Sequence, residues 1–382
     1  MPTRLIGTVA LLLLTVVPAT GQDKPAAGLA GTINALSAFD FATRMNAARM
    51  IRRVAAAEAV PALTLAARSH TDQFVRYRAL VLLVAFRDPG TPALMQTLLG
   101  DRNDRVREVV YRWYEDNPDM RSIPRLLAAL ETEQAEFVRP ALIRALAAHG
   151  ENEAARRALL LEAGRGLDFF RSAVIETLGD HRAGYAVKAI IPMLEFDGPL
   201  QDDAILALGR IGDRAALPAL ASLTKVPPEA TPSLQAAQCL LGDKCEERIA
   251  WLAQTARSTE TRLPVAKAAV AVLGVLATQD HAAALDALFD LDRTAERLRG
   301  DVAVALATMA LRRPPETIAW LGKAAAERRG RAMDLLHEGF DSLEEDFAEE
   351  QFYAAARAAY WAAPEGSEQR TLTASLIDKL EF

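Results

Sequence analysis

Polar and apolar positions along the chain recur with a step of 30 to 34 residues. A basic residue or a glutamine opens each unit, and an apolar residue follows four positions later, as Ala48, Leu80 and Ile143 do. Offsets of three, four and seven residues lie on one face of an α-helix. The pattern therefore predicts ten amphipathic helices of about three turns each. They begin near Arg44, Arg76, Arg107, Arg139, Arg171, Gln201, Gln235, Lys267, Arg299 and Arg331.

A second helix is predicted in each unit, starting about 16 residues after the basic residue. Four prolines mark the expected starts, because a proline is tolerated in a first turn, where the N–H has no partner within the helix. These prolines are Pro61, Pro92, Pro124 and Pro218. The sequence thus predicts a chain of helical pairs.

The clearest unit runs from 200 to 220 and contains A-L-G-R-I-G-D followed by A-L-P-A-L. It resembles the short HEAT-like repeats, armadillo-like in their helical packing, of phycobilisome-lyase-type proteins. The resemblance covers about residues 38 to 345 and is strongest from 70 to 225. The signature residues of tetratricopeptide and ankyrin repeats do not recur. The resemblance implies an all-α fold, an α-α superhelix of about ten helical pairs that serves as a scaffold and binding surface.

The resemblance also implies a structural ladder, in which the basic residue at each helix start pairs with an acid of an adjacent unit. Stacked units bury a continuous core, so we expect an elongated, curved rod. The ladder residues are Arg44, Arg76, Arg107, Arg139, Arg171, Lys267, Arg299 and Arg331.

The ends of the chain differ from the repeats. Residues 1–21 combine Arg4, a short apolar run and small residues, the layout of a secretory signal peptide. Residues 22–37 are rich in Ala and Gly and are expected to form a flexible leader. The repeat array is assigned to 38–345, and 346–382 is expected to form helices that cap the open end of the stack. We expect a periplasmic or secreted protein with no stable membrane span after signal cleavage.

Composition narrows the possible partners. The formal net charge of -6 argues against a nucleic-acid partner, because such proteins need a basic surplus to displace counterions. The chain has two cysteines, Cys239 and Cys245, on either side of a Gly-Asp turn. In an oxidising compartment a disulfide is expected, the alternative being two buried thiols. Their spacing fits neither a redox C-x-x-C motif nor a zinc site.

Catalytic chemistry is not indicated. The five histidines are isolated in the sequence, and neither a nucleophile elbow nor a phosphate loop is found. We therefore expect no catalytic residue, no cofactor and no metal, and a non-catalytic scaffold for an unknown protein partner. Two alternatives stay open: binding of a small molecule or glycan in the concave groove, or a lyase-type enzyme or enzyme accessory.

One segment has the composition of an interaction patch. Tyr111, Arg112, Trp113 and Tyr114 are residue types enriched at binding hot spots. Because Tyr111 and Tyr114 fall on the apolar stripe of their helix, the alternative is that this segment belongs to the core.

Overall fold

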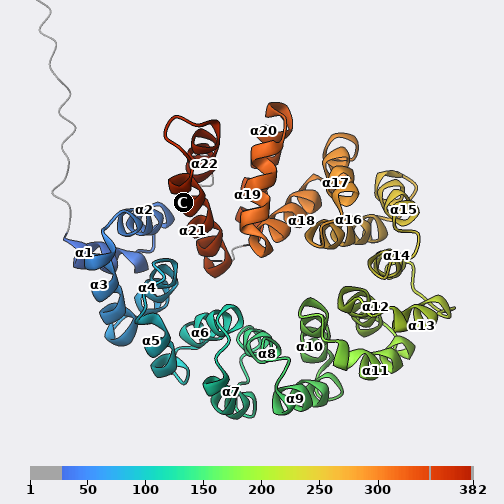
Figure 1. Ribbon diagram of the computed structural model, residues 1–382, viewed down its shortest axis with the longest axis horizontal. Coiled ribbons are helices and arrows are strands. Elements are labelled where there is room, and N and C mark those ends of the chain that lie inside the picture. The colour runs from blue at the N-terminus through green and yellow to red at the C-terminus, as the bar shows by residue number, and fades with distance from the viewer. Residues whose placement is uncertain (1–27, 344–345, 380–382) are drawn as a thin grey trace, which may run out of the picture.

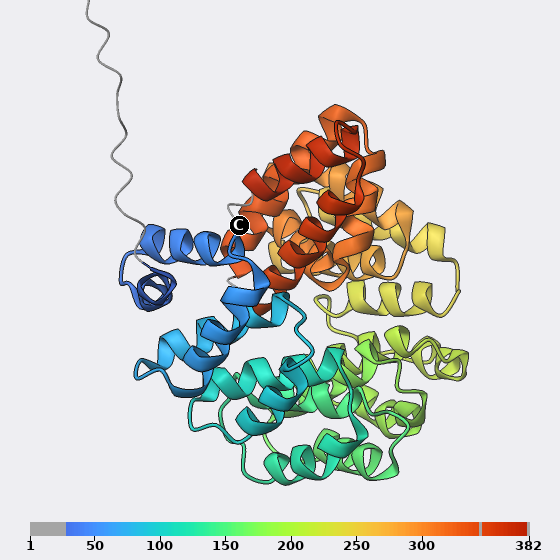
Figure 2. The same ribbon diagram turned by 60° about the vertical axis from the view of Figure 1, so that its left-hand side comes forward.

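The helices of this chain stack into an all-α solenoid whose two ends meet (Figure 1). The computed structural model describes residues 28–343 and 346–379, and all regular structure in these ranges is helical. The solenoid has an inner and an outer layer of helices, and it curls into a ring. Figure 2 shows the same ring from the side, with the last helices lying against the first. The predicted fold class is confirmed.

The inner layer consists of the helices predicted from the 32-residue step. Their bounds are α2 (Phe41–Arg52), α4 (Gln73–Ala85), α6 (Asp104–Asp116), α8 (Arg139–Ala147), α10 (Asp168–Asp180), α12 (Pro199–Ile211), α14 (Thr231–Leu240), α16 (Leu263–Thr278) and α18 (Arg299–Arg312). The tenth predicted helix, α20 (Ala326–Leu343), packs on α18.

The outer layer completes the pairs. It contains α3 (Ala56–Ser69), α5 (Thr91–Leu98), α7 (Ile123–Leu130), α9 (Glu153–Ala163), α11 (Val187–Ile190), α13 (Leu217–Ala221), α15 (Cys245–Arg257) and α17 (Ala282–Thr294), and α19 (Pro314–Lys323) pairs with α20. Short 3-10 turns cover Ala35–Ser37, Met120–Ser122, Gly184–Ala186, Ile191–Glu195, Arg214–Ala216 and Glu296–Leu298. The remaining helices are α1 (Leu29–Asn34), α21 (Asp346–Ala362) and α22 (Glu368–Lys379).

The ladder residues tie each pair of helices to the next. Arg107 donates to the carbonyl of Asp101 at 2.8 Å and to the Glu133 carboxylate at 2.7 and 3.0 Å. Arg139 repeats this arrangement one unit later, with the carbonyl of Leu130 at 2.9 Å and Glu162 at 2.5 Å. One guanidinium thus satisfies a backbone acceptor at the end of the preceding unit and a carboxylate near the end of its own unit, a use that suits its planar set of donors.

The ladder changes towards its C-terminal end. Lys267 and Arg299 pair with acids, at 3.1 Å from Asp301 and 2.7 Å from Asp292. Arg331 lies 3.7 Å from Asp292. The backbone acceptors of the last unit are bound instead by Arg329, which donates to the carbonyls of Leu321 and Ala324 at 3.0 Å each. The predicted position is therefore displaced by two residues in this unit.

Small residues let the inner helices approach closely. A Cβ on Gly209 of α12 would lie 2.5 Å from the Cα of Ala237 in α14. A Cβ on Gly339 of α20 would lie 2.3 Å from the carbonyl oxygen of Ala303 in α18. These positions therefore accept only a very small side chain where inner helices meet. The stack is curved, as expected, but it closes into a ring where an elongated rod was expected.

The ring closes through α2, α4 and α21. Arg52 donates to both oxygens of Glu350 at 3.0 and 3.1 Å, and these side chains are 9% and 2% exposed. Burial alone would lower the pKa of Arg52, but Glu350 outweighs it and raises that pKa. Phe347 joins the apolar core of the N-terminal half. The segment expected to cap an open end thus joins the two ends instead.

Two further sequence expectations need correction. The leader is helical from Leu29, and Leu36 is fully buried against the first repeats, so apolar burial orders the end of this segment. The helix expected to start at Pro61 starts at Ala56, five residues earlier. Pro61 is solvent-exposed, so water can reach the backbone carbonyl that the proline leaves unbonded.

The predicted signal peptide at 1–21 lies outside the described residues. In the described part of the chain, no helix has the length and apolar character needed to cross a bilayer.

Replacing Glu350 with Arg is expected to open the ring. The change leaves two guanidinium groups buried together, and breaking a buried ion pair from one side costs about 3–5 kcal/mol. Small-angle scattering should show a larger radius of gyration with unchanged helical circular dichroism. The double variant Arg52→Glu, Glu350→Arg restores opposite charges and should recover much of the compact profile. A single variant that scatters like the parent would show that other contacts close the ring.

Candidate functional site

Exposed apolar side chains gather at one edge of the ring, where the inner helices begin. Fourteen large apolar residues in the described ranges stand out as exposed, and eight of them lie within the five residues before one of the ten predicted helix starts. These eight are Phe39, Phe41, Phe74, Phe137, Leu167, Phe169, Phe196 and Leu263. More than half of these exposed apolar residues therefore fall within a window of five positions in the 32-residue unit.

Four phenylalanines form the centre of this edge. Phe41, Phe74, Phe137 and Phe169 stand two or three residues before ladder arginines and are 62%, 41%, 46% and 56% exposed. The inner helices lie side by side and in the same direction, so these rings follow one another along the edge. We call these four residues, with Phe196, the aromatic edge. The sequence analysis missed it, although the same 32-residue step carries the signal.

Guanidinium groups stand between the rings. Arg105 takes the place of a phenylalanine at the start of α6, and its Cζ lies 5.9 Å from the ring centroid of Tyr77 and 4.9 Å from that of Phe137. Further along, Arg171 lies 5.0 Å from the ring centroid of Phe196. Such contacts are attractive and hold each ring in place. On the aromatic edge, Arg105 and Arg171 thus lie against the rings of Phe137 and Phe196.

A cleft closes the N-terminal end of the aromatic edge. Its volume is about 480 Å³, and it lies where the two ends of the chain meet. Phe41, Phe74 and Arg105 line one side, and Asp341 and Glu349 line the other. The aromatic and basic groups on one side of the cleft thus face carboxylates on the other side.

The predicted patch at Tyr111, Arg112, Trp113 and Tyr114 is not a surface feature. Tyr111 and Tyr114 are 1% exposed and Trp113 is 9% exposed, all within α6. Arg112 pairs with Glu108 on the same helix at 3.2 Å. The apolar stripe at helical spacing packs the three rings into the core, so of the two alternatives that the sequence offered, the core assignment is confirmed and the interaction patch is not found.

The inner helices carry a second notable group of charges, where their C-terminal ends meet. Asp180 of α10 accepts hydrogen bonds from Arg144 at 2.8 Å and Arg210 at 2.9 Å. Arg312 reaches it at 3.2 Å from α18, across the ring. Glu115 of α6 accepts from the Nε of Arg144 at 2.9 Å. These groups satisfy one another, so the network connects five inner helices and serves the ring's structure.

The pKa values in this network diverge. Burial tends to raise the pKa of Asp180, but Arg312, Arg210 and Arg144 outweigh it and hold that pKa below its ordinary value. For Asp116, burial and then the neighbouring Glu115 raise the pKa to about 6. The pKa values of Asp180 and Glu115 are thus held low, so both stay ionised, whereas the neighbouring Asp116 takes up a proton near pH 6.

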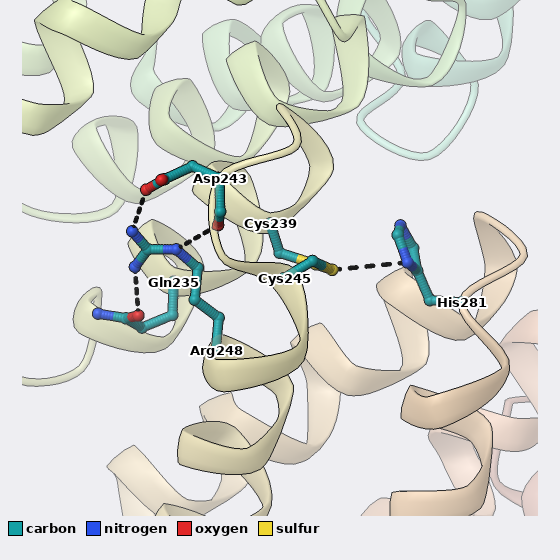
Figure 3. The surroundings of a disulfide bond; sticks show 6 residues. All are labelled: Gln235, Cys239, Asp243, Cys245, Arg248 and His281. Carbon is teal, nitrogen blue, oxygen red and sulfur yellow. Dashed lines mark hydrogen bonds and ion pairs between the residues drawn. A yellow bond between two sulfur atoms is a disulfide. The ribbon is translucent and has the colours of Figure 1, made fainter.

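The two cysteines bridge α14 and α15 at the turn between them. The structure joins Cys239 and Cys245 as a disulfide, with their Cα atoms 4.1 Å apart (Figure 3). Arg248 braces this turn by donating to the carbonyl of Asp243 at 2.8 Å and to Gln235 at 2.6 Å.

Comparisons with known proteins found one family match and a similar solved structure. Residues 29–112 match the family of HEAT repeats. Among solved structures, a chain of the "Kap95:Nup1 complex" is similar, with 10% identity and a TM-score of 0.40. That similarity covers 92% of this chain, which spans 56% of the neighbour's length. No curated protein sequence matches the chain.

Truncating Trp113 to Ala is expected to destabilise the protein without touching the aromatic edge. Loss of a buried Trp side chain costs about 3–5 kcal/mol because it removes apolar burial and leaves a cavity. Thermal and urea unfolding measure this cost. If the free energy of unfolding stayed unchanged, Trp113 could not be buried, and the core assignment would be wrong.

Replacing Asp116 with Asn is expected to have a pH-dependent effect on stability. The folded state holds a proton on Asp116 more tightly than the unfolded state, so ionisation costs stability as pH rises from 3.8 to about 6. Asn resembles the protonated form, so the variant should melt above the parent at pH 7.5 and converge with it below about pH 4. Glu260→Gln, in an exposed loop, is the control. An offset that is equal at every pH would contradict the electrostatic cause.

Proposed function

We propose that this chain, which is a HEAT-like repeat protein, is an exported, non-catalytic scaffold that binds a protein partner along its aromatic edge. HEAT-like solenoids commonly serve protein interaction, and the observation that points to this edge is its row of exposed rings at the ladder step. Export is proposed from the composition of residues 1–21.

The aromatic edge suits protein binding by its chemistry. Contiguous apolar surface of this kind marks interaction sites on folded proteins. Aromatic rings and arginines supply most binding energy at protein interfaces, because they bury large areas and stay ordered. Here the cation–π contacts hold the rings in place before binding, as Arg105 does for Phe137. Less conformational entropy is then lost when a partner docks.

The spacing of the rings favours an extended partner segment. Neighbouring packed helices lie about 8–10 Å apart, which sets the distance between rings at adjacent inner-helix starts, such as Phe137 and Phe169. A polyproline II segment advances about 3.1 Å per residue with three residues per turn, so every third side chain lies on one face about 9 Å from the last. A strand alternates its side chains with period two and cannot match this step on one face. We therefore propose a proline-rich, extended segment as the bound element.

Photo-crosslinking in intact source cells tests the proposal. A photoreactive amino acid at Phe137 should capture one defined partner in the cell-envelope fraction, with the crosslink mapped to an extended, proline-rich segment. The same probe at Leu161, an exposed apolar residue of α9 away from the edge, should capture none.

A paired variant separates binding from stability. The double change Phe137→Ser, Phe169→Ser should weaken affinity for the captured segment by at least about tenfold, since interface anchors contribute 2 kcal/mol or more. Its melting temperature should stay near that of the parent, because both rings are largely exposed. Leu65→Ser, Leu161→Ser is the matched control on the outer layer. Equal affinity of the two double variants, or a partner captured equally at Leu161, would refute the proposed edge.

A further inference from the structure

The fold brings a histidine to the cysteine pair that the sequence places far from it. His281 stands at the start of α17, 36 residues after Cys245, and its Nδ1 lies 3.6 Å from the Cys245 Sγ (Figure 3). The two sulfurs and one histidine nitrogen all lie within 4.8 Å of one another. Three potential ligands therefore converge from α14, α15 and α17.

The distance between sulfur and nitrogen is that of two ligands on one metal ion. Zinc bonds to thiolate sulfur at about 2.3 Å and to imidazole nitrogen at about 2.0–2.1 Å. With tetrahedral angles, these bonds place sulfur and nitrogen about 3.5–3.6 Å apart. The His281 Nδ1 and the Cys245 Sγ are thus already separated by the distance expected for two ligands of one ion. Only the Cys239 Sγ has to rotate away from the Cys245 Sγ after the disulfide is broken.

We propose that Cys239, Cys245 and His281 form a redox-gated site for a thiophilic d¹⁰ cation, Zn²⁺ or Cu⁺, for which the disulfide is the closed state. Two thiolates and one imidazole are the ligand set that such ions prefer. Three protein ligands leave a fourth position of a tetrahedral site for water or an incoming ligand. The inference is independent of the aromatic edge and of the proposed partner.

The chemistry of opening balances with a dithiol reductant. Attack of its thiolate breaks the Cys239–Cys245 bond through a mixed disulfide, and its second thiol completes the exchange. Two electrons and two protons pass to the cysteines, and the reductant leaves as its own disulfide. Binding of the metal ion then displaces both thiol protons, because only thiolates ligate.

The local surroundings allow access and metal exchange. Cys239 is buried, whereas Cys245 and His281 are partly exposed, so the ion would be reached from one side. Cys245 is the first residue of the 13-residue helix α15, where the helix dipole favours a thiolate. Glu246 and Glu247 follow it and oppose this effect on the thiolate, while adding negative charge that favours a bound cation.

Cobalt uptake by the full chain tests the site. The protein is reduced with a phosphine, freed of reductant without oxygen and titrated with Co²⁺. The expected result is thiolate-to-cobalt charge-transfer absorption at one ion per chain, bleached by added Zn²⁺. A second titration with Cu⁺ against a competing chelator distinguishes the two ions, and tight binding of either one supports the site. The untreated disulfide form should give no absorption.

Matched variants identify the ligands. His281→Ala and His281→Gln should each weaken binding by more than about tenfold, since even the loss of an outer-shell partner has that effect. His337→Ala, an exposed histidine of α20, should bind like the parent. Circular dichroism of each reduced variant reports the fold. Metal should raise the melting temperature of the reduced parent and of reduced His337→Ala, and it should raise that of the His281 variants less. Equal uptake by reduced and oxidised chains, or full affinity in both His281 variants, would overturn the proposal.

Discussion

The dominant constraint on this molecule is that a helical pair cannot bury its own apolar stripe. Each pair covers its neighbour, so an open stack always leaves one uncovered stripe at each end. Here the stack curves until the ends meet, and Phe347 of α21 enters the core of the first repeats. Adjacent inner helices meet closely at Gly209 and Gly339, where an added Cβ would clash with the neighbouring helix.

Charged residues play different parts in the interior of the ring and on its aromatic edge. In the interior, Asp180 is surrounded by Arg144, Arg210 and Arg312, and the acids and bases satisfy one another. On the aromatic edge, by contrast, arginines lie against rings whose other faces meet solvent. The edge is therefore the surface proposed for recognition, while the interior charges hold the helices together.

The repeat, the fold class and the ladder positions could be predicted because they follow from a local pattern of apolar and basic residues that recurs in every unit. Ring closure could not, because it sums small differences in helix spacing over the whole chain. The burial of Trp113 could be inferred as one of two alternatives, because its neighbours Tyr111 and Tyr114 lie on the apolar stripe of the same helix. His281 beside Cys245 was not visible, because adjacency in space across two helices leaves no trace in sequence spacing. Arg329 takes the role predicted for Arg331 because it follows its carbonyl acceptor Leu321 by eight residues, the spacing that separates Arg171 from Ala163.

Closure also changes how the molecule responds to damage. In an open solenoid, one cut in a connecting loop leaves two pieces that share a single interface. In a ring, each piece keeps two interfaces, one at the cut and one at the pair formed by Arg52 and Glu350. Separating the pieces then requires both to break at once, so a proteolytic nick leaves the particle assembled.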